Sequence, residues 1–126
     1  MSYTFNRLLA GVSFAEADAR KALGEGGFGI LTEIDVVATM KKKLDVEMTP
    51  YLILGACNPK MAYQAIGIEP RVGAMLPCNV ILRAVDGGVE VSAIDPVASM
   101  QAIENPALHA VAGQVRDLLA TAVAAI

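Results

Sequence analysis

The strongest constraint on the fold is a pair of alternating segments joined by two glycines. In residues 79–85 and 89–94, apolar side chains alternate with other side chains, as in strands that cover a core with one face. Gly87 and Gly88 stand between them, and glycine accepts the positive φ angles of a tight hairpin turn. We therefore predict an antiparallel hairpin with Gly87-Gly88 as its loop. One face would hold Val80, Leu82, Ala84, Val91 and Ala93, and the solvent face would hold Arg83, Glu90 and Ser92.

Further segments also have strand character. Residues 3–9 and 28–34 alternate, and we expect both faces of the second segment to be partly covered. Residues 51–56 form a near-continuous apolar run, which is typical of a strand buried on both sides, so we expect it at the centre of the sheet. Residues 72–76 are predicted to form a short strand that Pro77 interrupts.

Helices are predicted where a capping residue precedes an apolar stripe. Ser13 with Glu16 forms a capping-box pattern, and Asp35 can cap a short helix. Two Asn-Pro pairs begin helices, because asparagine caps free amides and proline at the first helical position loses no hydrogen bond. The predicted helical segments are residues 13–23, 36–44, 60–66, 96–103 and 106–126. We expect the last of them to close the core or a dimer seam.

These elements predict an α+β fold in which helices cover a sheet containing at least one antiparallel hairpin. No internal repeat, low-complexity tract or linker divides the sequence. The predicted connections are short, as they are within one compact unit. Residues 1–126 are therefore predicted to form a single α+β domain.

The chain is more apolar than a typical domain of its class. Hydrophobic residues other than glycine make up 55% of it, against roughly 45 to 50% with glycine included in typical domains. The excess can be buried in a tight alanine-rich core, in an apolar ligand pocket or in a surface shared with a second copy. Of these three we favour the shared surface, and we predict a homodimer.

Charge and hydropathy disfavour two classes of partner. The net charge of −3 leaves no basic field that would attract a nucleic acid. The lysine run 41–43 is offset by Asp45 and Glu47, which lie within a Debye length. Charged residues break the C-terminal apolar stretch before it reaches the roughly 18 residues of a membrane span. We therefore expect neither a nucleic-acid partner nor a membrane.

Four segments resemble a known bacterial family. Residues 27–36 (GFGILTEIDV), 50–59 (PYLILGACNP) and 76–80 (LPCNV) look like the three most recognisable blocks of the domain of unknown function 302 family, and residues 94–96 (IDP) follow in order. The resemblance implies a small α+β protein that often associates as a dimer. It implies no established activity.

Two cysteines are the residues most suited to chemistry. The first residues lack the continuous apolar stretch of an export signal, so we expect a cytoplasmic protein with free thiols. Cys57 and Cys78 each precede an asparagine and lie beside a turn that contains a proline. Cys57 stands before a helix start, whose dipole we expect to lower the pKa of its thiol. If the strands around the two cysteines pair antiparallel, their sulfur atoms meet at one edge of the sheet.

Cys57, Asn58, Cys78 and Asn79 are therefore the candidate ligand-binding residues, and the two cysteines are also the candidate catalytic residues. Three interpretations of the cysteines stay open: packing as small hydrophobes, a reversible thiol pair or electrophile acceptor, and a soft-metal site. The metal site has the weakest ligand set, because there is no Cys-x-x-Cys motif and His109 is the only imidazole. We predict no metal and no other cofactor.

The other polar residues have structural explanations. His109 lies in the first turn of the last helix, where the dipole disfavours a protonated imidazole, and we expect it to be exposed or partly packed. Glu33 and Asp35 would share a strand face as an acid/base pair does, but a helix cap explains Asp35 and strand exposure explains Glu33. Neither phosphate-loop motif occurs.

The sequence favours a homodimeric module that binds a small molecule or a protein partner without catalysis, because it lacks a catalytic constellation. The alternative is a thiol-dependent redox or transfer protein that uses Cys57, with Cys78 as its resolving or supporting thiol. Soft-metal binding is the third hypothesis. The sequence does not decide whether the chain is an enzyme.

Overall fold

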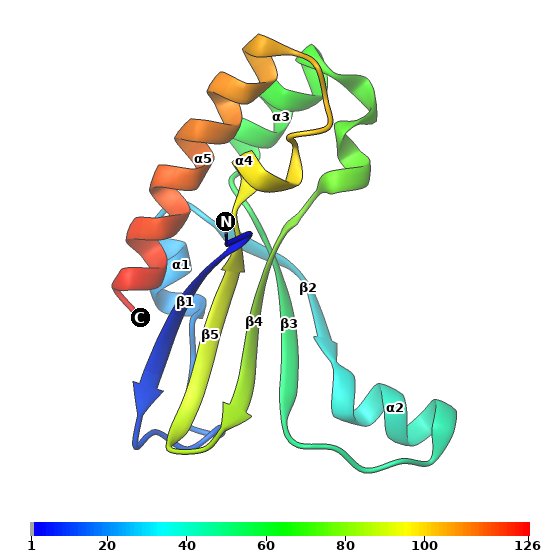
Figure 1. The fold of residues 1–126 in the computed structure, drawn as a ribbon, viewed down its shortest axis with the longest axis vertical. Helices are drawn as coiled ribbons and strands as arrows, with labels where there is room; N and C mark the ends of the chain where they lie inside the picture. Colours follow the sequence, from blue (N-terminus) through cyan, green and yellow to red (C-terminus); the bar gives the residue numbers. More distant parts are fainter. Residues whose placement is uncertain (1) are drawn as a thin grey trace.

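Five strands form one antiparallel sheet in the order β1-β5-β4-β3-β2, and helices cover one of its faces (Figure 1). The computed structural model describes residues 2–126. The strands are β1 (Thr4–Ala10), β2 (Gly29–Asp35), β3 (Tyr51–Cys57), β4 (Cys78–Val85) and β5 (Gly88–Ile94). The helices are α1 (Arg20–Glu25), α2 (Val36–Leu44), α3 (Pro59–Ile68), the 3-10 helix η1 (Pro70–Met75), α4 (Pro96–Ser99) and α5 (Pro106–Ala124). The predicted α+β class is confirmed.

β4 and β5 form the predicted hairpin with the predicted division of side chains between its two faces. Ser92, predicted to face solvent, is buried, and the loop is one residue earlier than expected. Val85 pairs with Gly88, so the two loop residues are Asp86 and Gly87. Gly87 has a φ of +87°, which favours a residue without a Cβ. Gly88 is needed for another reason, because a Cβ there would clash with the carbonyl oxygen of Leu9 on β1. The second glycine therefore permits the β1–β5 contact and not the turn.

β3 is an inner strand, but β4 and not β3 occupies the centre of the sheet. β3 pairs with β2 on one side and with β4 on the other. Leu54 and Ala56 are buried on the helix-covered face. Gly55 faces the other way, where a Cβ would lie 2.6 Å from Cγ of Pro77. The predicted interior position is confirmed, whereas the apolar run, which reports burial, does not indicate which interior strand is the middle one.

β2 is an edge strand, so the expectation that both of its faces are partly covered was wrong. Six of its seven residues are exposed, and the side chain of Leu31 is 64% exposed. The ladder to β3 shifts register between Ile30 and Thr32, which interrupts the strict alternation read from the sequence. Phe28, just before the strand, is buried in the core.

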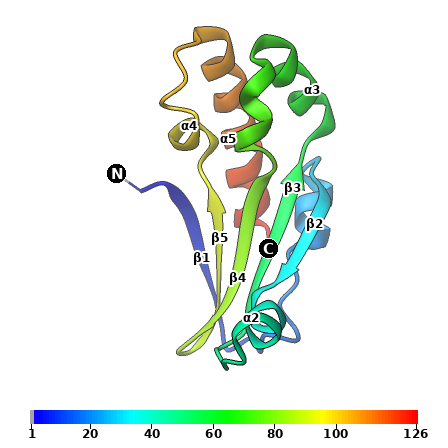
Figure 2. The same cartoon turned by 90° about the vertical axis from the view of Figure 1, so that its right-hand side faces the viewer.

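α1 and α5 lie together on one face of the sheet, and the described helices leave the other face uncovered (Figures 1 and 2). α5 begins as predicted, with the Asn105 side chain accepting a hydrogen bond from the Leu108 amide at 3.3 Å. At its other end, Arg7 of β1 donates to the carbonyl of Ala124 at 2.6 Å. Within residues 2–126, none of the helices has the length and apolar character that crossing a membrane requires.

α1 is shorter than the helix predicted over residues 13–23. The Ser13 carbonyl accepts hydrogen bonds from the amides of Glu16 and Ala17, which closes an isolated turn instead of a first helical turn. The chain then restarts at Asp18, whose carboxylate accepts from the Arg20 amide at 2.9 Å. The capping box therefore does not form; α1 begins after Ala19, which makes no side-chain cap hydrogen bond.

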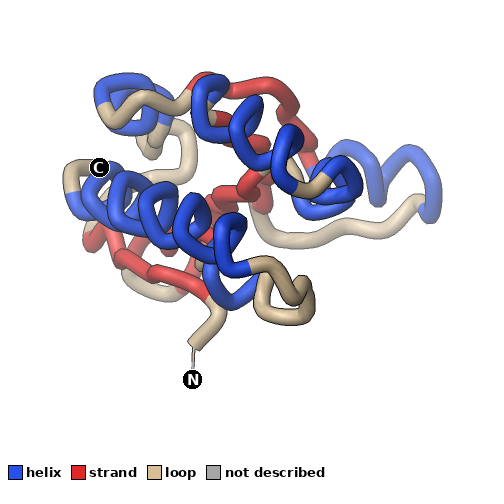
Figure 3. The backbone as a smooth tube through the Cα atoms, turned by 90° about the horizontal axis from the view of Figure 1, so that it is seen from above, coloured by secondary structure: helices blue, strands red, loops and turns tan. Residues whose placement is uncertain are grey.

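Beyond one end of the sheet, α3, η1 and α4 pack against the first half of α5. Figure 3 shows α3 and α5 side by side, with α2 apart from both. Asn58 caps α3 as predicted, and the helix continues to Ile68, two residues further than expected. Residues 70–75 form a 3-10 helix, so the short strand predicted over residues 72–76 is absent.

α2 protrudes from the fold at the opposite end (Figure 1). Asp35 caps it as predicted, with its carboxylate accepting from the Ala38 amide at 3.0 Å. No residue of α2 is buried. Lys41, from the basic run, forms ion pairs with Asp45 at 2.8 Å and Glu47 at 3.0 Å, which agrees with the predicted charge compensation.

Two clusters of buried side chains make up the interior. The sheet core lies between the strands and the helices α1 and α5, and it includes Leu54, Leu82, Val91 and Leu119. The helical core lies among α3, η1, α4 and α5, and it includes Ala65, Val72, Met100 and Leu108. Val115 of α5 packs against both cores, so their junction lies beside the middle of α5.

Candidate functional site

Both cysteines lie where β3 ends and β4 begins. These strands run antiparallel with Ala56 opposite Cys78, so Cys57 is one residue past that pair. Both are free thiols; Cys57 is half-buried and Cys78 is buried. The predicted meeting of the two positions at one end of the sheet is therefore present. It follows from the strand pairing, because the end of one antiparallel strand lies beside the start of its neighbour.

A cavity of about 30 Å³ lies beside both cysteines, where the sheet core meets the helical core. Its wall is apolar except for the two thiols and one amide. It is lined by Phe28, Ala56, Cys57, Asn58, Met61, Ala62, Ala65, Leu76, Cys78, Pro96, Met100, Leu108, Val111, Ala112 and Val115. We call this space the junction cavity.

The two candidate asparagines lie on different sides of the sheet. Asn58 lines the junction cavity, but its side-chain oxygen accepts a hydrogen bond from the Met61 amide at 3.1 Å and so caps α3. Asn79 is exposed and pairs with Gly55 on the uncovered face, where it borders a separate groove beside Pro77. The structure thus brings together three of the four candidate ligand-binding residues.

Burial keeps both thiols protonated near neutral pH. The pKa of Cys78 is raised to about 11, first by burial and second by repulsion from Cys57. Burial also raises the pKa of Cys57. This direction is opposite to the expected lowering by the α3 dipole, because burial disfavours the charged thiolate. Since the thiolate is the nucleophile, neither sulfur is activated for attack in this arrangement.

Two methionines add further sulfur atoms to the cavity wall. Met61 belongs to the first turn of α3 and stands four positions after Cys57. Met100 follows α4 directly and is buried. Neither methionine is among the candidate residues predicted from the sequence. The short spacing from Cys57 was an available signal for Met61, whereas Met100 reaches the cavity only through the placement of α4.

The other polar candidates lie outside the junction cavity. His109 is exposed on α5, with its Nε2 against the carbonyl oxygen of Ile103. Glu33 forms an ion pair with Arg20 at 2.6 Å, and Asp35 is occupied as the cap of α2. Among the described residues 2–126, no three His, Cys, Asp or Glu side chains gather as a group that could hold a metal ion.

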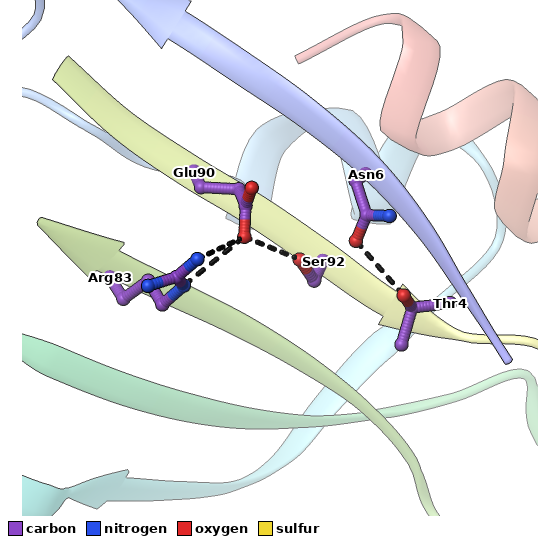
Figure 4. Close-up of polar contacts among 5 residues, drawn as sticks. All are labelled: Thr4, Asn6, Arg83, Glu90 and Ser92. Atoms are coloured by element: carbon purple, nitrogen blue, oxygen red, sulfur yellow. Dashed lines mark hydrogen bonds and ion pairs between the residues drawn. The ribbon is translucent and has the colours of Figure 1, made fainter. Parts of the chain in front are cut away.

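The uncovered sheet face carries a polar network. Arg83 donates to Oε1 of Glu90 from Nε at 3.1 Å and from Nη2 at 3.0 Å, and the Ser92 hydroxyl donates to the same oxygen at 3.3 Å (Figure 4). On β1, the hydroxyl of Thr4 donates to Oδ1 of Asn6 at 3.0 Å. These side chains satisfy one another, so the network is not a preformed binding site for an ion.

Beside the polar network, an apolar row crosses the same face. In the strand register, Ile81 of β4 lies opposite Ile53 of β3, which lies opposite Ile34 of β2. All three side chains are half-buried or exposed. The row lies on the side of the sheet opposite α1 and α5, so neither of these helices covers it.

The comparisons identify a family and a fold. The model of the family described as "Domain of unknown function DUF302" matches residues 6–126. A solved structure, "Crystal structure of uncharacterized conserved protein DUF302 from Bacillus stearothermophilus", matches with a TM-score of 0.89. The match covers 98% of this chain and 98% of that chain at 23% sequence identity, so the likeness shows the fold. No curated protein matches the chain.

Proposed function

Given that the chain belongs to the DUF302 family, whose description assigns no activity, we propose that it is a homodimeric, non-catalytic binding module. Its ligand is a small species held in the junction cavity beside Cys57 and Cys78. The observation that carries this proposal is the position of the cavity, which lies between two separately packed cores and contains both free thiols. Binding sites are commonly apolar spaces between packed units with a few polar groups.

The volume of the cavity limits what it can hold. Cavities that bind a drug-sized molecule measure roughly 300 to 1,000 Å³, and a cavity that binds benzene measures roughly 150 Å³. The junction cavity measures about 30 Å³, which is closer to the volume of a single small species. Flexible side chains such as Met61 and Met100 can adapt their rotamers to such a species.

The same wall supports a role without catalysis. The described lining contains no carboxylate, imidazole or amine, so no general acid or base stands beside the thiols. The thiols themselves are held protonated by burial, which raises the pKa of each. A ligand in this cavity therefore meets groups that can contact or coordinate it, and none that is poised to transfer a proton at neutral pH.

Native mass spectrometry tests the ligand directly. The chain is purified without chelators, measured under native conditions and measured again after denaturation. We expect an added mass that denaturation removes. Ala65→Val adds methyl groups at a wall of the junction cavity and should lower the fraction of chains that carry the ligand. Ala110→Val, on the exposed side of α5, should leave that fraction unchanged. A native mass equal to that of the polypeptide alone would contradict the proposed function.

The homodimer has a separate structural basis in the α2 arm, which we define as residues 36–48. Its helix buries no side chain, and Leu44 is 66% exposed. Val46 and Met48 are also exposed. The apolar row on the uncovered sheet face is likewise left open by α1 and α5. A twofold pair in which each arm lies on the partner's uncovered face would bury both surfaces at once.

Light scattering with an arm variant tests this association. We expect the wild-type chain to have the mass of two copies at micromolar concentration. Leu44→Glu combined with Val46→Glu should give a monomer with an unchanged circular dichroism spectrum. Tyr63→Glu is the control, because Tyr63 is 84% exposed on α3, away from the arm. A monomeric wild type, or a dimer that survives the arm variant, would refute this arrangement.

A thiol-dependent function is the second candidate, because Cys57 and Cys78 share one cavity. In that function both thiols together give two electrons and two protons to a disulfide substrate, forming one Cys57–Cys78 disulfide and two substrate thiols. The raised pKa of each thiol opposes it, since it lowers the thiolate fraction. Alkylation at neutral pH decides: labelling of Cys57 as fast as a free thiol supports this candidate, and slower labelling removes it.

A further inference from the structure

Sulfur is the chemical feature that the walls of the junction cavity share. Cys57 reaches it from the end of β3 and Cys78 from the start of β4. Met61 comes from the first turn of α3 and Met100 from the residue after α4. Four residues that carry a thiol or a thioether therefore come from four separate parts of the chain to line one space. The helical core contributes two of these groups and the strand ends contribute the other two.

We propose that the ligand of the junction cavity is a single soft monovalent metal ion, copper(I), bound by the sulfur atoms of Cys57 and Cys78 with Met61 and Met100 as additional donors. This inference rests on the proposed function and names its ligand class. Thiolate and thioether sulfur are the soft ligands that select copper(I) over hard cations. The lining offers no carboxylate oxygen, which calcium and magnesium require.

The size of the cavity agrees with an ion better than with an organic molecule. Its free volume of about 30 Å³ is enough for one small species between the lining residues. A metal–thiolate bond of roughly 2.3 Å, as in zinc sites, needs little more space than the ion itself. Cys57 and Met61 are half-buried, which leaves a side of the site that an ion can reach from solvent. Cys78 and Met100 form its buried side.

The reaction balances in protons and charge. Two neutral thiols and one copper(I) ion give a bis-thiolate complex with a net charge of −1 and two released protons. No electron is transferred, because copper enters and stays in the monovalent state. The N-terminus of α3, a helix of ten residues, lies directly after Cys57, and its partial positive charge offsets the charge of the complex.

A competition titration tests the site. The reduced, metal-free chain is titrated anaerobically with copper(I) against a chromophoric copper(I) chelator. We expect one ion per chain, two protons released per ion and near-ultraviolet thiolate–copper absorption. Met61→Leu combined with Met100→Leu keeps both thiols and the core volume, and it should weaken binding at least tenfold. The control Met48→Leu combined with Met75→Leu changes two exposed methionines and should bind as the wild type does.

The outcomes separate this inference from the proposed function. If the double methionine variant binds copper(I) as tightly as the wild type, or if the urea-unfolded chain does, the folded four-sulfur site is refuted. If native mass spectrometry shows a retained organic mass and copper(I) does not bind, the ligand site stands and the copper inference falls. If neither a retained mass nor copper(I) binding is found, both fall. Cys78→Ser should abolish binding to the folded chain, and unchanged binding would also overturn the proposal.

Discussion

Raising the pH should destabilise the metal-free protein through the buried thiol of Cys78. This residue is 6% exposed, and its pKa is raised to about 11 from an ordinary value of 9.0. Below pH 9 both the folded and the unfolded chain keep the proton, so the thiol adds no pH dependence. Between about pH 9 and 11 the unfolded chain loses the proton while the folded chain keeps it, so the free energy of unfolding falls as the pH rises.

The size of this effect follows from the difference between the two pKa values. The free energy of unfolding falls by about 3 kcal/mol in all once the Cys78 thiol of the folded chain has also lost its proton. About 2 kcal/mol of this loss is reached near pH 10.5. Cys57 adds a contribution of the same sign, because burial raises its pKa as well. The cavity lining holds no other titratable side chain among the described residues that would oppose the two thiols.

Urea unfolding of the wild type and of Cys78→Ala, followed by far-ultraviolet circular dichroism, measures this loss. Both proteins are kept reduced and free of metal between about pH 8 and pH 10.5. Tyrosine and lysine titrate in the same range, and taking the difference between the two proteins cancels their contribution. We expect the stability advantage of the wild type to shrink by about 2 kcal/mol across this range. A constant difference would refute the inference that burial raises the pKa of the Cys78 thiol.

Three further substitutions test the fold around the site. Gly55→Ala places a Cβ 2.6 Å from Cγ of Pro77, so we expect the free energy of unfolding, measured in urea, to fall by roughly 1–3 kcal/mol. An unchanged free energy of unfolding would mean that β3 can shift at this position. Asn58→Ala removes the cap of α3 and should cost about 1 kcal/mol, and a negligible loss would mean that water replaces the side chain. Arg83→Gln breaks a solvent-exposed ion pair with Glu90 and should lower the free energy of unfolding by less than about 1 kcal/mol. The difference from the wild type should vanish at high salt. A larger loss would contradict the solvent exposure of this ion pair.

The sequence predicts the parts of the fold that depend on neighbouring residues. Strand faces in the hairpin follow from alternation, and the caps Asp35 and Asn58 act on amides three residues away. The turn position depends on a distant segment, because Gly88 is required by β1 and not by the loop. The order of the strands and the exposure of β2 are also tertiary properties, so the apolar run 51–56 gave burial without giving its place in the sheet.

The candidate site likewise has features that follow from local sequence patterns and features that depend on tertiary packing. The approach of Cys57 to Cys78 follows from antiparallel pairing of two predicted strands, so the sequence contained it. Alternation along β4 separates Asn79 from Cys78, because adjacent residues on a strand point to opposite faces. Alternation alone would also turn Cys57 away from the cavity that Ala56 lines, so the place of Cys57 in the cavity wall depends on how β3 ends. The raised thiol pKa and the position of Met100 depend on how α4 and α5 cover the sheet end, which no local pattern encodes.

The proposed ligand site and the α2 arm lie at opposite ends of β3, and we expect them to act independently. Cys57 ends this strand beside the junction cavity, and Tyr51 begins it after the α2 arm. β3 is held between β2 and β4 by ladders on both sides, so a change at one end cannot move the strand without breaking several hydrogen bonds. Distant sites without shared contacts behave additively. Leu44→Glu combined with Val46→Glu should therefore bind copper(I) with wild-type affinity in the chelator competition, and a tenfold change would mean that the partner copy completes the site.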